Sequence, residues 1–161
     1  MILLVMDDFT QFDAFDRCRE FARGIAEQLN RGVFAKDPVL TTELRKTLLS
    51  VYSNFAEGFE RDGNREFAQF VSIAKGSVGE ARGQLIYALD FGYLKPEMFS
   101  DLDRLGKTAT QCLGGLIRYL NDSSFRGRKF KQRDDVRNKA RPRKRPRGTS
   151  NAERRTLNAE P

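Results

Sequence analysis

The sequence contains no histidine, and this absence excludes several classes of protein. Histidine is the side chain that most often acts as a general base near neutral pH, and it is the commonest metal ligand. Helical bundles that bind paired metal ions use inward-facing Glu-x-x-His motifs, which this chain cannot supply. The chain also lacks a glycine-rich phosphate loop of the Walker or dinucleotide-binding type. We therefore expect a protein that is not an enzyme, with no catalytic residue, no metal site and no cofactor.

Cysteine is scarce, since the chain has only Cys18 and Cys112. Both fall on apolar faces of predicted helices, which favours small buried thiols in a reducing compartment over a secreted disulfide framework. No segment approaches the roughly 18 consecutive apolar residues that a membrane span requires. The apolar start, residues 1–6, lacks the basic lead and the cleavage site of a secretion signal. We expect a cytoplasmic protein with no membrane association.

Charge is distributed unequally along the 161 residues. Residues 1–122 hold 15 Lys and Arg against 18 Asp and Glu, a net charge of −3, whereas residues 123–161 hold 14 against 4, a net charge of +10. The second segment contains the run Arg-Pro-Arg-Lys-Arg-Pro-Arg at residues 141–147, and a composition of this kind stays disordered when unbound. The predicted parts are an N-terminal lead (residues 1–8), a folded body (residues 9–122) and a disordered basic tail (residues 123–161).

The folded body shows helical periodicity in four segments, where apolar residues recur at alternating steps of three and four. We expect helices over about residues 10–30, 38–58, 64–91 and 96–120. The predicted core stripes, in the same order, are Phe12, Phe15, Cys18, Ala22, Ile25 and Leu29; Leu40, Leu44, Leu48, Val51 and Phe55; Phe67, Phe70, Val71, Ala74, Val78, Ala81, Leu85 and Ala88; and Met98, Leu102, Leu105, Ala109, Cys112, Leu116 and Leu120.

Local signals mark the ends of these helices. Asp37 followed by Pro38 is a strong helix start, because aspartate accepts from free amides and proline loses no needed hydrogen bond at the first helical position. Thr10 and Asn64 are the expected caps of the first and third helices, and Gly92 is the expected terminator of the third. Short links make neighbouring helices antiparallel. The predicted fold is all-α, an antiparallel up-down-up-down four-helix bundle with a disordered basic C-terminal tail.

One motif goes beyond what helical periodicity requires. Residues 53–59 have the sequence S-N-F-A-E-G-F, followed by Arg61, by Glu66-Phe67 and by the small pair Gly76-Ser77. This pattern closely resembles the signature of the four-helix-bundle proteins encoded within intervening sequences of bacterial 23S ribosomal RNA genes, which has the form S-N-I-A-E-G-F-x-R, then E-F, then G-S. The resemblance covers roughly residues 9–120. It implies a four-helix bundle and a homopentameric ring, and it brings no catalytic role to these positions.

The motif residues cluster at the end of the second predicted helix and on the helix that it faces. The favoured interpretation is that Asn54 and Glu57 satisfy the free backbone groups at the helix ends; the alternative is a polar cluster between the two helices. The motif residues, interpreted as structural, are Asn54, Glu57, Gly58, Gly76, Ser77 and Glu80.

A ridge of small residues lies along one face of the third predicted helix, formed by Ser72, Gly76, Gly79 and Gly83. Each glycine lowers helix propensity, so something is expected to approach closely there. The neighbour is either another helix of the same bundle or a second subunit, and resemblance to a homopentameric family favours the second subunit.

Basic residues are the candidates for binding nucleic acid. Three in the body match basic positions of the resembling family, although exposed Lys and Arg are ordinary surface residues; in a ring they would repeat to form a basic surface. The tail can neutralise several phosphates in a salt-sensitive manner, and its alternative role is that of a solubilising appendage. The candidate nucleic-acid-binding residues are Arg45, Lys46, Arg61, Arg126, Arg128, Lys129, Lys131, Arg133, Arg137, Lys139, Arg141, Arg143, Lys144, Arg145 and Arg147.

Three functions are compatible with these features. The preferred one is a non-enzymatic, oligomeric protein that binds nucleic acid, with RNA favoured. The second is that of the accessory variability proteins of diversity-generating retroelements, to which the chain is similar. Those proteins resemble basic pentamers that bind a reverse transcriptase and its RNA. The run Gly114-Gly115-Leu116-Ile117 also resembles their sequences. The third is a protein-interaction scaffold whose basic tail is incidental.

Overall fold

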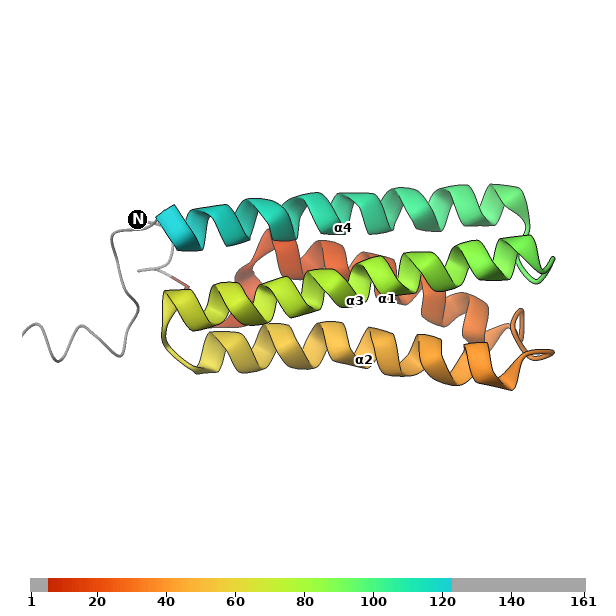
Figure 1. Ribbon diagram of the computed structural model, residues 1–161, viewed down its shortest axis with the longest axis horizontal. Coiled ribbons are helices and arrows are strands. Elements are labelled where there is room, and N and C mark those ends of the chain that lie inside the picture. The colour runs from red at the N-terminus through yellow and green to blue at the C-terminus, as the bar shows by residue number, and fades with distance from the viewer. Residues whose placement is uncertain (1–5, 123–161) are drawn as a thin grey trace, which may run out of the picture.

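The computed structural model describes residues 6–122, which form a four-helix bundle (Figure 1). The long helices lie side by side, with the α1–α2 and α3–α4 links at one end and the α2–α3 link at the other. Within residues 6–122 no strand is present. The elements are a short 3-10 helix, η2 (Phe9–Gln11), followed by α1 (Asp13–Asn30), α2 (Pro38–Glu60), α3 (Asn64–Asp90) and α4 (Pro96–Asp122). The predicted all-α bundle is confirmed, while the tail lies outside the described residues.

Two of the predicted helix boundaries have the expected geometry. Oδ1 of Asp37 accepts a hydrogen bond from the amide of Leu40 at 2.8 Å, and Pro38 is the first residue of α2. At the end of α3, Gly92 has a φ of +72° and its amide donates to the carbonyl of Leu89 at 3.0 Å. This left-handed conformation is accessible to glycine at little cost, so Gly92 ends the helix as predicted.

The two other predicted caps are wrong. The amide of Thr10 donates to Oδ1 of Asp8 at 2.7 Å, so Thr10 belongs to η2, and the N-cap of α1 is Phe12, which makes no side-chain cap bond. Asn64 is the first residue of α3, and Gly63 is its N-cap. Phe12 and Asn64 are both buried.

The core stripes predicted for α1, α2 and α3 are confirmed, with Phe70 alone among them half-buried. Phenylalanine rings gather where η2 and α1 meet α2 and α3, with ring centroids 5.0 to 5.8 Å apart and mostly in edge-to-face contact. Aromatic pairs of this kind contribute about 0.5–1.5 kcal/mol beyond the area they bury. The rings belong to Phe12, Phe15, Phe55, Phe59 and Phe67.

The stripe predicted for α4 is only partly right. Gly106 and Leu113, which the prediction omits, are fully buried, because α4 packs against both α1 and α3 and so buries a broader face. The predicted residues divide into the buried Leu102, Ala109 and Leu120 and the half-buried Met98, Leu105, Cys112 and Leu116. The expectation of two buried thiols therefore holds for Cys18 and is wrong for Cys112.

No helix within residues 6–122 combines the length and the apolar composition that crossing a membrane requires.

Candidate nucleic-acid interface

The family-like motif on α2 contributes a polar cluster between α2 and α3. Nδ2 of Asn54 donates to the carbonyl and to Oγ of Ser50, at 2.8 and 3.1 Å, and Oγ of Ser50 lies 2.9 Å from Oγ of Ser77 across the helix pair. Farther along the pair, Nε2 of Gln84 donates to Oγ1 of Thr47 at 3.1 Å. A polar cluster is therefore present between α2 and α3, joined by the Ser50–Ser77 and Gln84–Thr47 hydrogen bonds, while Asn54 binds Ser50 within α2.

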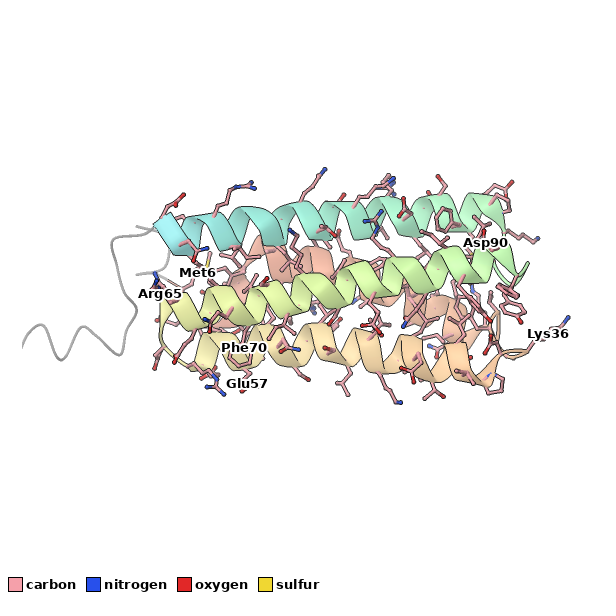
Figure 2. All side chains as sticks on the ribbon, viewed as in Figure 1. Met6, Lys36, Glu57, Arg65, Phe70 and Asp90 are labelled. Carbon is pink, nitrogen blue, oxygen red and sulfur yellow. The ribbon has the colours of Figure 1, made fainter. Side chains whose placement is uncertain are left out.

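Glu57 lies outside this cluster. Its Oε1 accepts hydrogen bonds from Nη2 and Nε of Arg61, at 2.6 and 3.2 Å. The guanidinium carbon of Arg61 lies 4.7 Å from the centroid of the Phe70 ring, a cation–π contact. A methyl group added at Gly58 would overlap the Cβ atom of Phe70. Glu57 and Phe70 lie at the same end of the bundle (Figure 2), and these motif residues hold α2 against α3.

The two remaining motif residues face outward. Glu80 is exposed, and its Oε1 accepts a long hydrogen bond of 3.4 Å from Nε2 of Gln84. Gly76 is also exposed, whereas its neighbour Ser77 is buried against α2. The motif thus divides into residues that join α2 to α3 and residues on the outer face of α3.

The predicted ridge of small residues is uncovered within the described chain. A methyl group added at any of the three glycines, Gly76, Gly79 and Gly83, would have no neighbouring atom of residues 6–122 within 4 Å. The hypothesis that another helix of the same bundle packs there is therefore wrong. Two isoleucines beside the ridge are also exposed, Ile73 by 51% and Ile86 by 45%, so this face of α3 is smooth and partly apolar.

Two of the three predicted body cations are neutralised by carboxylates on α2. Nζ of Lys46 lies 3.0 Å from Oε1 of Glu43, and Arg61 is paired with Glu57 as described above. Arg45 is exposed and makes no ion pair with another described residue. Of these three cations, Arg45 is therefore the one without a carboxylate partner among the described residues.

Arg45 lies on the rim of an open groove between α1 and α2. Arg23 lines the same groove and, like Arg45, makes no ion pair within residues 6–122. Burial raises the pKa of the Tyr52 hydroxyl in this groove, while the positive charges of Arg19 and Arg23 oppose that rise. The remaining lining is Ala22, Ala26, Leu29, Leu48 and Leu49. The groove has an apolar floor and two unneutralised arginines, of which Arg23 was missed because sequence spacing does not show which residues of two helices become neighbours.

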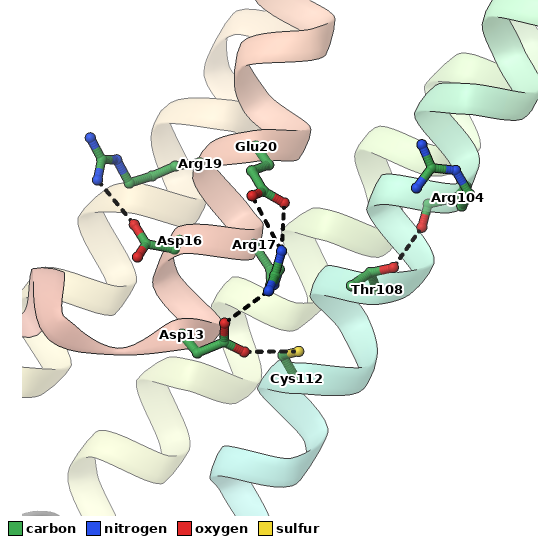
Figure 3. Close-up of polar contacts among 8 residues, drawn as sticks. All are labelled: Asp13, Asp16, Arg17, Arg19, Glu20, Arg104, Thr108 and Cys112. Carbon is green, nitrogen blue, oxygen red and sulfur yellow. Dashed lines mark hydrogen bonds and ion pairs between the residues drawn. The ribbon is translucent and has the colours of Figure 1, made fainter.

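Other cations of α1 are neutralised on their own helix. Arg17 lies between Asp13 and Glu20, at 3.2 and 3.1 Å, and Arg19 lies 3.0 Å from Asp16 (Figure 3). Exposed pairs of this kind contribute about 0–1 kcal/mol to stability, but they remove positive charge from the surface. Further cations without an ion pair to another described residue are Lys36, Arg65, Lys75, Lys95, Arg104 and Arg118.

A buried carboxylate, Asp103 on α4, forms ion pairs with two more cations. Its Oδ1 lies 2.9 Å from Nη2 of Arg82 on α3, and its Oδ2 lies 2.7 Å from Nζ of Lys107. Burial opposes ionisation of Asp103, but the hydrogen bonds and charges of Lys107 and Arg82 outweigh it and lower the pKa. A methyl group at Gly106 would lie 2.8 Å from Cγ and Cδ of Arg82, so this glycine makes room for the bridge between α3 and α4.

The predicted tail cations, between residues 126 and 147, lie outside the described residues. Within residues 6–122, no group of three or more Cys, Asp or Glu side chains is arranged to hold a metal ion.

Comparisons with known proteins agree with this architecture. The sequence profile of the 23S rRNA-intervening sequence protein family matches residues 10–115. A crystal structure of a protein of unknown function from the S23 ribosomal protein family of Bacteroides thetaiotaomicron is similar in fold, with a TM-score of 0.60 and 19% sequence identity. The alignment covers 65% of this chain and 97% of that chain. Among curated proteins, none matches the chain significantly.

Proposed function

The chain belongs to the 23S rRNA-intervening sequence protein family, and on that premise we propose that it is a non-enzymatic, oligomeric protein that binds nucleic acid, with RNA as the favoured ligand. The bundle supplies the assembly surface, and the basic tail supplies most of the attraction to phosphate.

The observation that carries the proposal is the separation of charge between the two parts of the chain. The body, residues 1–122, has a net charge of −3 and the tail, residues 123–161, a net charge of +10. A segment with fourteen cations in 39 residues can replace counterions along a phosphate backbone with little sequence preference. A nearly neutral body would not bind strongly by itself, so affinity is expected to depend on the tail.

The body adds a smaller contribution at the α1–α2 groove. Arg23 and Arg45 are unneutralised there, whereas Lys46 and Arg61 are paired with carboxylates of α2. We therefore assign the role of phosphate contact in the body to Arg45 and Arg23, and we assign Lys46 and Arg61 to the stability of α2 and of its contact with α3.

Oligomerisation is supported by the uncovered ridge on α3. Three glycines on the outer face of a helix lower helix propensity by roughly 0.8–1 kcal/mol each relative to alanine, yet nothing in residues 6–122 packs against them. A second copy whose helix approaches the ridge closely would explain why small residues occupy it. Several tails on one assembly would then bind one RNA together, and the avidity of the assembly would exceed the affinity of a single tail.

Binding is tested by titrating single-stranded RNA with the full chain across salt from about 0.05 to 0.2 M, where six to ten phosphate contacts predict a loss of roughly 300-fold to 10⁴-fold in affinity. A matched variant replaces the arginines of residues 141–147 with glutamine in the full chain. We expect that variant to bind more weakly and with a shallower salt dependence. Equal binding by both proteins would contradict the role of the tail, and absence of binding by both would contradict the proposed function.

Oligomeric state is tested by sedimentation of the wild type and of Gly79→Leu, which fills the ridge without touching the core. We expect the wild type to form a closed oligomer and the variant to be smaller in mass with its helical content unchanged. A wild-type protein that remains monomeric at high concentration would overturn this part of the proposal.

Two alternative functions, a retroelement accessory protein and a protein-interaction scaffold, predict different observations. Flanking 23S rRNA sequence beside the gene supports a protein of the intervening-sequence type, whereas an adjacent reverse transcriptase gene with a near-repeated template supports an accessory variability protein. A protein-interaction scaffold is favoured by the same uncovered ridge on α3, and it predicts an oligomer or a protein complex without RNA binding.

A further inference from the structure

An exposed stack of aromatic rings lies where α3 ends and α4 begins. The rings of Tyr87 and Phe91 have centroids 4.3 Å apart and an interplanar angle of 27°, and those of Phe91 and Tyr93 are 6.4 Å apart at 24°. Tyr87 is 40% exposed and Phe91 is 61% exposed. Among the described phenylalanines, Phe91 is the one classed as exposed; the others are buried or half-buried. Tyr93 is half-buried and packs against the core. The chain therefore presents aromatic surface of Tyr87 and Phe91 to solvent at this end of the bundle.

The position of Tyr87 is fixed by the start of α2. Its hydroxyl donates to Oδ2 of Asp37 at 3.2 Å, while Oδ1 of Asp37 accepts from the amide of Leu40. Desolvation, and then the hydrogen bond to Asp37, raise the pKa of Tyr87, so the hydroxyl stays protonated and continues to donate. The ring is therefore oriented before any ligand arrives.

The backbone after α3 fixes the two other rings. Gly92 reverses the chain with a φ of +72°, and the amides of Tyr93 and Leu94 both donate to the carbonyl of Ala88, at 2.8 and 3.0 Å. Leu94 is buried in the core. This anchored turn holds Tyr93 beside Phe91, and an oriented platform loses little conformational entropy when a ligand stacks on it.

Two cations flank the aromatic stack. Lys36 directly precedes Asp37, and Lys95 follows Tyr93 by two residues; both are exposed and neither makes an ion pair with another described residue. Lys36 extends away from the bundle at this end (Figure 2). The acidic residues near the stack are Asp37, which accepts the hydrogen bond from Tyr87, Asp90, near the same end (Figure 2), and Glu97 in the first turn of α4. Exposed aromatic rings close to lysines without a carboxylate partner favour a ligand that has both aromatic rings and negative charge.

We propose that Tyr87, Phe91 and Tyr93 form a platform on which bases of single-stranded nucleic acid stack, with Lys36 and Lys95 contacting the adjoining phosphates. Stacking on aromatic side chains is tolerant of sequence, because every base has a π face, and it is available only where bases are unpaired. This inference rests on the proposed nucleic-acid association and adds to it a contact with bases, which the tail does not require.

The platform lies at the opposite end of the bundle from Asp122, the last residue of α4. α4 runs from this end of the bundle to the opposite end (Figure 1), and its 27 residues span roughly 40 Å at 1.5 Å per residue.

The test compares binding of the full chain to oligoadenylate of about ten nucleotides and to an abasic oligomer of equal length and charge. We expect the wild type to prefer oligoadenylate, and Phe91→Ala to lose roughly tenfold in affinity for it while binding the abasic oligomer as before, since stacking contributes about 1–3 kcal/mol per base. Val39→Ala is the matched control, because Val39 is 73% exposed near the same end and carries no ring. Phe91→Trp should retain the preference.

A second readout uses the tyrosines. The chain has no tryptophan and four tyrosines, two of them in the platform, so stacking of a base on the rings should quench intrinsic tyrosine fluorescence with oligoadenylate and not with the abasic oligomer.

The outcomes separate the platform from the proposed function. If the wild type binds both oligomers equally and Phe91→Ala changes nothing, the platform is wrong while tail-driven binding stands. If Phe91→Ala instead dissociates the protein assembly into smaller species, the rings form a contact between subunits and the inference is overturned. If the wild type binds neither oligomer at low salt, the proposed function fails and the platform fails with it.

Discussion

Gly58 on α2 and Phe70 on α3 are in contact without space for a side chain between them, since a methyl group on Gly58 would overlap Cβ of Phe70. The Arg61 guanidinium stacks on the same ring and is paired with Glu57. The residues Glu57, Gly58 and Arg61 of the motif are thus explained by one close contact between two helices.

Replacing Gly58 with alanine should therefore destabilise the protein by about 1–3 kcal/mol, the range for overpacking a tight contact. Gly115→Ala is the matched control, because a methyl group there meets no atom of the described chain within 4 Å and alanine stabilises a helix by about 0.5–1 kcal/mol relative to glycine. Urea denaturation of both variants measures the difference. Equal effects in the two variants would contradict the close contact.

Asp37 should contribute more to stability than its partner Tyr87. Asp37→Ala removes both the cap of α2 and the hydrogen bond to Tyr87, and loss of a cap costs about 1 kcal/mol. Tyr87→Phe removes the second bond alone and keeps the ring, so it should lower stability less than Asp37→Ala. Thermal unfolding measures the stability of the two variants. If Tyr87→Phe were the less stable of the two, Asp37 would not act as the cap of α2.

Stability should fall in acid as Asp103 is protonated. The pKa of Asp103 is lowered from its ordinary value of 3.8, so its contribution is present above that pH and is lost as the pH falls through the lower folded-state value. Asp103→Asn should lose this pH dependence and be about 1–3 kcal/mol less stable near neutral pH, because Arg82 and Lys107 lose a charged partner. Asp101→Asn, at an exposed aspartate of the same helix, should change stability by less than about 0.5 kcal/mol.

The two cysteines should react at different rates. Burial, with a smaller effect of Cys112, raises the pKa of Cys18 to about 12. Burial and then the Asp13 carboxylate raise the pKa of Cys112, whose Sγ donates to Oδ2 of Asp13 at 3.6 Å (Figure 3). Because the thiolate is the reactive form, half-buried Cys112 should be labelled slowly in the native protein and Cys18 only after unfolding.

Alkylation followed by mass spectrometry measures these rates, and Cys112→Ser should leave the native protein unlabelled. Simultaneous labelling of both thiols below the unfolding transition would show that Cys18 is more accessible than its burial indicates.

The family assignment was available from the sequence because it depends on residues close together in the chain. Residues 53–61 carry most of the motif, and the matching profile covers residues 10–115. The role of the individual motif residues was less accessible. Ser77 does lie between α2 and α3, but Asn54 binds Ser50 of α2, Glu57 binds Arg61 and Glu80 faces outward. Spacing does not show toward which neighbour a long side chain turns.

The sequence by itself determined where most helices begin and end and which faces of α1, α2 and α3 are buried. These properties follow from local signals, the Asp37-Pro38 start, Gly92 in a left-handed conformation and apolar residues every three or four positions. It also determined the separation of charge between body and tail, which is a property of composition alone.

Only the tertiary structure decided which surfaces remain uncovered. Periodicity predicts that a helix has an apolar face, but the width and centre of the buried face depend on how many helices pack against it. For this reason Leu113 is buried in α4 where Cys112 was expected. The glycines of α3 face outward because no other helix of residues 6–122 covers them. The groove that Arg23 and Arg45 both line and the bridge between Arg82 and Asp103 bring together residues of different helices. Such contacts exist only once the four helices have taken their places around the common core.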